Sequence, residues 1–150
     1  MYVSARSDYA LRAMLAVAAA STGGAGGYGG DGAGLVKAAA LAEAQGMPLS
    51  FLQGILLDLR RAGLLHSHRG TEGGYALTRP AAEISVGDVL RAVGGSLTSV
   101  RGLPAQDAGY HGVASGLQHV WLAVDDAIAL VVDRTTLAEL LVRESGTATA

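Results

Sequence analysis

The stretch that decides the fold is residues 37–77, KAAALAEAQGMPLSFLQGILLDLRRAGLLHSHRGTEGGYAL. It opens with a short alanine-rich helix over 37–45, and Gly46 is well placed to end that helix in the left-handed conformation. Pro48 suits the start of a second helix, which runs to residue 62. Four apolar residues form one stripe along it: Leu52, Ile55, Leu56 and Leu59. Two helices joined by a tight glycine-containing turn form a helix-turn-helix unit, whose second helix enters the DNA major groove.

The residues that follow predict a β-hairpin. Residues 64–69 have the pattern of a short strand, 70–74 of a glycine-rich turn, and 75–77 of a returning strand. A helix-turn-helix followed directly by a hairpin is the winged-helix arrangement. The predicted fold is therefore mainly α with a small β-hairpin wing, and residues 1–80 form a winged helix-turn-helix DNA-binding domain.

The start of this domain is a predicted helix followed by a glycine-rich segment. Apolar residues recur at spacings of three and four over residues 4–20, and Ser4 or Ser7 is suited to cap the start. Eight of the twelve residues from Gly23 to Gly34 are glycine. We expect residues 22–34 to be a flexible loop without a function of its own.

The second half, residues 81–150, is predicted to connect and to dimerise. A short helix over 86–93 is capped by Ser85, residues 96–115 are expected to be irregular, and one long helix covers 116–142. The apolar seam of that helix has little else in the chain to pack on, so a second copy is expected to cover it. The residues predicted to form this homodimer contact are Leu117, Val120, Trp121, Val124, Ile128 and Val131, with Leu137 and Leu141 continuing the seam.

Charge and composition limit the classes of protein. The net charge is −2, but residues 1–80 hold 7 basic and 5 acidic residues (+2), whereas the remainder holds 4 and 8 (−4). A basic front half suits a protein that turns only that half to DNA phosphates. The chain has no cysteine, which excludes disulfides and thiolate-bound metal. No uncharged apolar run reaches 18 residues, and Arg6, Asp8 and Arg12 interrupt the first apolar stretch, so we expect a cytoplasmic protein without a membrane span.

The candidate DNA contacts lie on the second helix and the wing. Arg69, beside the glycines of the hairpin tip, is suited to a narrow minor groove. Ser50 and Gln53 begin the exposed side of the second helix, where Gln can pair with adenine and Ser with phosphate or base. Solvated faces carry the same residue types, so the remaining contacts are weaker candidates. They are Lys37, Arg60, Arg61, Ser67, His68, Gly70 and Thr71.

Other chemistry has little support. His66 and His68 share one strand face, but only Glu72 is at hand to complete a metal site, so we predict no metal. His111 and His119 could sense pH or line an effector pocket, although ordinary surface positions explain them as well. Asp8 and Arg12 are spaced for a surface ion pair. With no set of nucleophile and base and no phosphate loop, the chain is not expected to be an enzyme.

Three segments together carry a family resemblance. Residues 60–95, RRAGLLHSHRGTEGGYALTRPAAEISVGDVLRAVGG, resemble the wing and following helix of the Rrf2 family, the IscR/NsrR/CymR-type regulators. Residues 4–15, SARSDYALRAML, and 135–140, TTLAEL, also resemble it. The resemblance implies a dimeric winged-helix repressor or activator that binds palindromic DNA.

The resemblance fails at the family's iron–sulfur site. Many members hold a cluster through three cysteines in the loop after the fourth helix. Here residues 100–118 read VRGLPAQDAGYHGVASGLQ, and the family's ligand positions fall at Gly102, Ala108 and Ala114, which cannot bind iron. We therefore expect no cofactor.

The resemblance also suggests a regulated process. The cluster-free CymR branch controls cysteine and sulfur assimilation genes, in part through a partner enzyme. We expect a sequence-specific homodimeric regulator, a repressor, with such genes as candidate targets. The alternatives are an interaction module acting through a partner enzyme, or a regulator that responds to a metal or to a small-molecule effector bound at residues 96–115.

Overall fold

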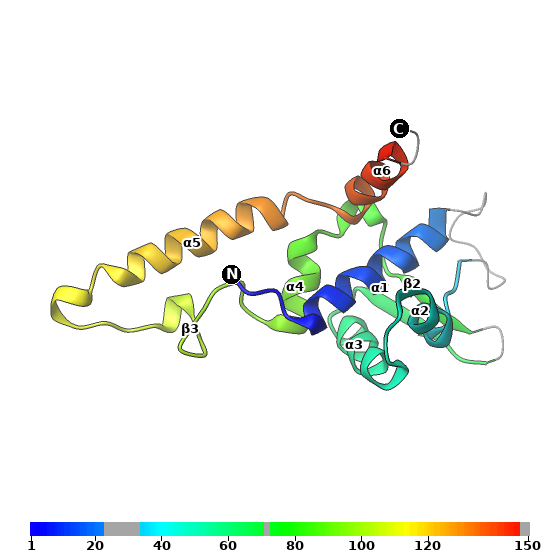
Figure 1. Cartoon of the computed structure of the whole chain (residues 1–150), viewed down its shortest axis with the longest axis horizontal. Coiled ribbons are helices and arrows are strands. Elements are labelled where there is room, and N and C mark those ends of the chain that lie inside the picture. Colours follow the sequence, from blue (N-terminus) through cyan, green and yellow to red (C-terminus); the bar gives the residue numbers. More distant parts are fainter. Residues whose placement is uncertain (23–33, 71–72, 148–150) are drawn as a thin grey trace.

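The computed structural model describes residues 1–22, 34–70 and 73–147 (Figure 1). Most of the predicted glycine-rich loop, and Thr71 of the predicted DNA contacts, lie outside these residues. The elements follow one another as α1 (Ala5–Thr22), α2 (Ala38–Gln45), α3 (Leu49–Arg61), β1 (Leu65–His68), β2 (Gly74–Leu77), η1 (Ala81–Glu83), α4 (Val86–Gly94), β3 (Ser99–Val100), β4 (Leu103–Pro104), η2 (Ala105–Asp107), η3 (Gly112–Ala114), α5 (Leu117–Val132) and α6 (Leu137–Thr147). The predicted mainly α fold with a hairpin wing is confirmed.

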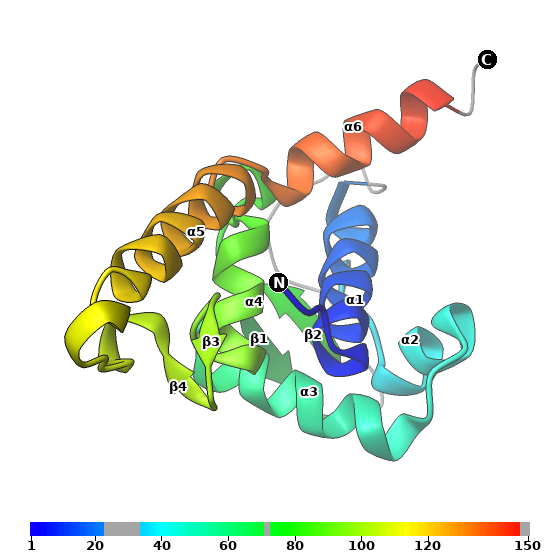
Figure 2. The same ribbon diagram turned by 60° about the vertical axis from the view of Figure 1, so that its left-hand side comes forward.

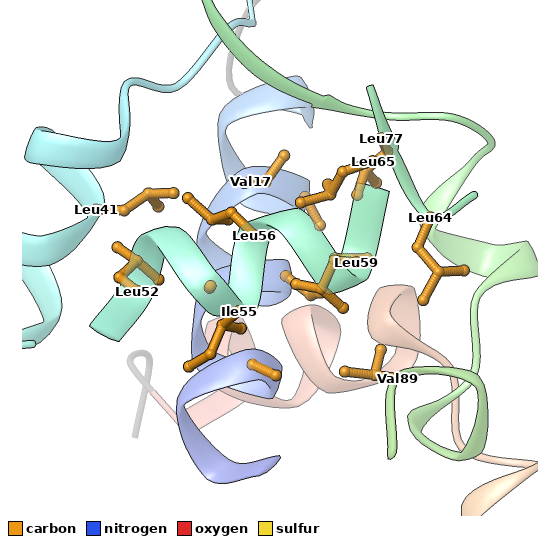
Figure 3. Close-up of a cluster of buried hydrophobic side chains, with 14 of the residues drawn as sticks. Val17, Leu41, Leu52, Ile55, Leu56, Leu59, Leu64, Leu65, Leu77 and Val89 are labelled. Carbon is orange, nitrogen blue, oxygen red and sulfur yellow. The ribbon is translucent and has the colours of Figure 1, made fainter. Parts of the chain in front are cut away.

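The core forms around the inner face of α3, which lies among α1, α2, α4 and the hairpin β1–β2 (Figures 2 and 3). The predicted stripe of Leu52, Ile55, Leu56 and Leu59 is wholly buried there. Each such side chain contributes about 1.5–3 kcal/mol of burial free energy. This packing fixes which side of α3 remains outside.

Helix ends follow the sequence signals. The Ser4 Oγ accepts the Ser7 N–H at 3.1 Å, so Ser4 caps α1. Gly46 ends α2 with φ 63° and ψ 38°, as expected for a left-handed C-terminal residue. Ser85 and Asp88 form a reciprocal capping box at the start of α4, with both hydrogen bonds at 3.0 Å.

The second half of the chain closes the same core. Ile84, Val89 and Leu137 are fully buried beside residues of α1 and α3. The helix α4 packs along α1, and α6 contacts α1 and η1.

The predicted long helix over 116–142 is wrong, because the structure divides it into α5 and α6. The backbone between them pairs with the segment before α4: the Val86 N–H donates to the Thr135 carbonyl at 2.8 Å, and the Leu137 N–H donates to the Ile84 carbonyl at 3.0 Å. Leu137 thereby enters the chain's own core rather than an outer seam. The seam ends with α5.

Residues 96–115 are also more ordered than predicted. Strands β3 and β4 form a short antiparallel hairpin, and Val100 pairs with Leu103. The two residues between them, Arg101 and Gly102, both have positive φ, 50° and 78°. Two left-handed residues are what a tight two-residue hairpin turn requires.

Candidate nucleic-acid interface

The outer face of α3 is open to solvent. Ser50, Gln53, Gly54, Arg60 and Arg61 are all exposed, opposite the buried stripe. A Cβ added to Gly54 would meet no atom within 4 Å, so the fold itself does not require glycine there. The predicted contacts on this helix therefore share one accessible face.

The wing is joined to one edge of this face. The Arg60 Nη1 donates to the Ser67 Oγ at 3.2 Å, which links two of the predicted contacts directly. His68, Arg69 and Gly70 are exposed beyond that bond. Lys37 is also exposed, and it follows Val36, whose backbone pairs with Tyr75 of β2. The structure therefore places Arg60 on the wing side of α3, and Lys37 beside the other strand of the wing, β2.

The wing glycines have a packing role. A Cβ on Gly73 would lie 2.2 Å from the His68 carbonyl oxygen, and one on Gly74 would lie 2.8 Å from the Val36 carbonyl oxygen. Gly70 has φ 107°, which L side chains rarely adopt. These glycines shape the tip that carries Arg69.

The start of α1 borders the opposite edge of α3. Arg6 forms an ion pair with Asp58 of α3, and the Tyr9 and Phe51 rings meet edge to face at 5.6 Å. The predicted pair of Asp8 and Arg12 is present at 2.7 Å. The sequence does not predict the contact of Arg6 with Asp58, because the two residues lie 52 positions apart.

Comparison with known proteins agrees with this architecture. Residues 3–143 match the Rrf2 family, described as iron-dependent transcriptional regulators. The chain belongs to the Rrf2 family. It is a DNA-binding transcriptional regulator rather than an enzyme.

Relatives and solved structures support this family assignment. A candidate HTH-type transcriptional regulator of Mycobacterium tuberculosis, Rv1287, is 44% identical over 93% of this chain and 81% of its own. IscR of Escherichia coli is 34% identical over 94% of this chain and 80% of its own. The structure titled CymR, the global cysteine regulator of B. subtilis, covers 93% of this chain and 95% of its own at 26% identity and TM-score 0.70. The structure of T. potens IscR covers 100% of this chain and 92% of its own, at 31% sequence identity and a TM-score of 0.72.

In this Rrf2 protein the residues present do not fit an iron–sulfur cluster. At the three positions where the resemblance places cluster ligands stand Gly102, Ala108 and Ala114, whose side chains offer no donor atom, and Ala108 is fully buried. His66 and His68 have ring centroids 5.0 Å apart. Within residues 1–22, 34–70 and 73–147, no group of three or more His, Asp or Glu could hold a metal ion.

The loop before α5 is fastened to that helix by its own side chains. The Trp121 Nε1 donates to the Tyr110 hydroxyl at 2.7 Å, and the Arg101 guanidinium lies 5.1 Å from the centroid of the Tyr110 ring. Trp121 is thus half-buried against its own chain. His111 and His119 are exposed.

The helix α5 extends from the body of the regulator (Figure 1). None of its residues, all of which the structure describes, is buried. Leu117, Val120, Val124 and Val131 of the predicted seam are exposed, and Ile128 is half-buried. By length and composition alone, the segment Gly112–Val132 is also apolar enough to cross a membrane, with a mean hydropathy of 1.2.

An ion pair anchors the end of α5 to α4. Arg91 donates to both carboxylate oxygens of Asp133, at 2.6 and 2.8 Å. This hydrogen-bonded contact lowers the pKa of Asp133 and raises that of Arg91. A Cβ on Gly87 would come within 1.8 Å of the Asp133 Oδ1, so the pair depends on glycine there.

A polar hollow of about 350 Å³ lies beside this pair. The hollow is separate from residues 96–115, where a small-molecule effector would bind under the alternative function considered from the sequence. Its lining residues are Ala82, Glu83, Ser85, Asp88, Arg91, Asp133 and Thr136.

Proposed function

We propose that this Rrf2 regulator is a cytoplasmic repressor that binds a palindromic operator as a homodimer. The observation that carries the proposal is the outer face of α3, which lies open between the wing and the start of α1 while its inner face is buried. In this division of labour, residues 1–80 bind DNA, and residues 81–150 connect, dimerise and receive any signal.

The exposed residues suggest distinct roles at the DNA. Ser50 and Gln53, at the start of α3, would meet base edges in the major groove. Arg69 at the wing would enter the neighbouring minor groove. The remaining candidates would hold the sugar-phosphate backbone. They are Lys37, Arg60, Arg61, Ser67, His68, Gly70 and Thr71.

A second copy of the chain is the proposed cover of α5. Leu117, Trp121, Val124, Ile128 and Val131 follow one another at alternating spacings of four and three, the repeat of two helices that pack side by side. Val120 widens this seam. Asp125 and Asp126 lie within the same helix, and two carboxylates are costly in a bilayer. A protein partner therefore suits α5 better than lipid.

The operator can be found with the protein itself. Duplexes selected from a random library by the parent protein are titrated against scrambled duplexes at fixed salt. A regulator is expected to prefer its selected duplex by at least roughly a thousandfold, and that duplex should contain an inverted repeat. Equal binding of both duplexes would overturn the proposal and favour an interaction module acting through a partner enzyme.

Repression is tested separately from binding. The selected operator is placed at the promoter of a reporter, and transcription is measured in vitro with and without the protein. We expect transcription to fall as the operator is filled. A rise would make the protein an activator while leaving the DNA-binding proposal intact.

The proposed regulation needs no iron–sulfur cluster. Protein purified without oxygen is therefore expected to be colourless and to contain no stoichiometric iron, because the chain supplies no thiolate. Iron analysis and an absorption spectrum check this. One iron or more per chain, with a charge-transfer band, would point instead to His or carboxylate ligands.

Genes of cysteine and sulfur metabolism are the candidate targets. The support is the structural similarity to the protein titled the global cysteine regulator of B. subtilis. Mapping the selected operator onto the source genome tests the assignment. Operators away from any sulfur gene would overturn this assignment without affecting DNA binding.

A further inference from the structure

The recognition helix α3 carries one acidic residue, Asp58, among the residues Leu49–Arg61. At 100° per residue, Asp58 lies on the same flank as Phe51, one side of the outward stripe formed by Ser50, Gly54 and Arg61. Its side chain is 31% exposed, so its charge reaches solvent near the proposed DNA face.

A carboxylate at this place opposes DNA binding. Duplex DNA carries about one negative charge per 1.7 Å of its axis. Charges interact over roughly 8–10 Å at physiological salt, which is comparable to the diameter of a helix. An unpaired Asp58 would therefore repel the phosphates that flank the groove.

Arg6 cancels this charge from outside the recognition helix. It belongs to α1, and its guanidinium forms an ion pair with the Asp58 carboxylate. On α3 itself, Arg60, Arg61 and Asp58 sum to +1, and Arg6 raises the local sum to +2. Arg6 is 35% exposed, so the pair lies at the surface rather than in the core. Ion pairs at the surface contribute little to stability.

We propose that Arg6 is a positioning residue for DNA binding. It masks the carboxylate of Asp58 and so lets α3 approach the phosphate backbone. The inference rests on the proposed use of α3 as the recognition helix. It adds a role for α1, which none of the predicted contacts includes.

A double-mutant cycle separates masking from direct contact. Affinity is measured for the parent, Arg6→Gln, Asp58→Asn and the double variant, on both the selected and the scrambled duplex. Arg6→Gln is expected to weaken binding roughly two- to tenfold, and the loss should shrink as salt rises. Asp58→Asn is expected to bind at least as tightly as the parent. In the Asp58→Asn background, Arg6→Gln should weaken binding clearly less than in the parent background, because no carboxylate remains to be unmasked.

Two further variants guard the interpretation. Arg6→Lys keeps the charge and should retain the parent's affinity. Arg143→Gln removes an arginine that is also ion-paired, to Glu139 on α6, and should leave DNA binding unchanged. Thermal melting and native mass confirm that each variant is folded and assembled like the parent.

Specific outcomes would overturn the masking role. An equal loss from Arg6→Gln with and without Asp58 would mean that Arg6 acts on the phosphates through its own charge rather than by masking Asp58. No loss in the parent background would mean that Asp58 does not affect DNA binding. Phosphates repel the Asp58 carboxylate in any duplex. The affinity for the scrambled duplex therefore tests the masking role even if the parent shows no preference for the selected duplex. Such a lack of preference would count against the proposed function alone.

Discussion

The helices α3 and α5 are both amphipathic, but only α3 has its apolar face covered within one chain. The apolar stripe of α3, from Leu52 to Leu59, is wholly buried, whereas α5 buries none of its residues. The outer face of α3 is polar and open. It needs no cover from a second chain and is available to a ligand. The difference indicates that α3 presents a binding surface, while α5 needs a second apolar surface.

The largest expected effect comes from a charge in the α5 seam. We predict that Val124→Asp dissociates the dimer or unfolds the protein, raising the dissociation constant at least tenfold, about 1.4 kcal/mol, because a carboxylate would be buried against apolar side chains. Native mass at micromolar concentration checks this. Leu130→Asp is the matched control, since Leu130 is 54% exposed on α5 but lies off the seam. Equal dissociation by both variants, or by neither, would contradict the assignment of the seam.

A smaller loss is expected at the wing. Arg69→Ala should weaken binding to the selected duplex by roughly 1–3 kcal/mol, because a specific DNA contact is removed. The fold and native mass should not change, since Arg69 is exposed. The measurement is a titration at fixed salt, with Arg134→Ala, an exposed arginine between α5 and α6, as the control. Affinity equal to that of the parent would show that the wing does not work as proposed.

Gln53 sharpens the same test. Gln53→Ala is expected to relax discrimination at particular base pairs, because its amide would read a base edge. A uniform loss over selected and scrambled duplexes would assign Gln53 to the backbone instead.

The outer face of α3 can also be tested without DNA. Gly54→Ala should stabilise the protein by up to about 1 kcal/mol, because alanine favours a helix over glycine and no atom lies within 4 Å to clash. Urea unfolding measures this. Gly109→Ala changes a similarly open glycine outside any helix and should not give that gain. Destabilisation by Gly54→Ala would mean that this face is covered in the free protein.

The smallest expected effect concerns the anchor of α5. The pKa of Asp133 is lowered by Arg91, so the pair stabilises the fold above the ordinary aspartate pKa of about 3.9 and loses its effect as the pH falls through the lowered value. Both side chains are about 40% exposed, so Asp133→Asn should cost no more than about 1 kcal/mol at pH 7. The difference from the parent should narrow below about pH 3.9. A difference that widens towards acid would contradict this sign.

The sequence predicts well those features that depend on neighbouring residues. The stripe of α3, the turn at Gly46 and the cap at Ser85 each arise from residues within about ten positions of one another, and all are present. The wing follows for the same reason. The roles of Gly73 and Gly74 become clear only from their contacts with the His68 and Val36 carbonyls.

Features that depend on distant residues could not be predicted from the sequence. Residues 133–137 contain neither proline nor glycine, so the predicted helix runs through them, although Thr136 and Glu139 have the spacing of a helix start and the Thr136 Oγ accepts the Glu139 N–H at 3.1 Å. The break arises because the backbone there pairs with residues 84–86. The ion pair of Arg6 with Asp58 spans 52 positions and has no sequence signature. The bond of Arg60 to Ser67 spans only seven positions, but it joins a helix to a strand, so neither helical nor strand spacing predicts it.

The stoichiometry of the complex with the selected duplex, measured by native mass spectrometry, tests most directly whether the regulator binds DNA as a homodimer. Two chains joined through α5 would present two copies of α3, about one DNA turn or a multiple of it apart. We therefore predict two chains per inverted repeat, and no stable complex of Val124→Asp with the duplex at the concentration that saturates the parent. If the parent protein binds the duplex as a single chain with its full affinity, binding as a homodimer is contradicted.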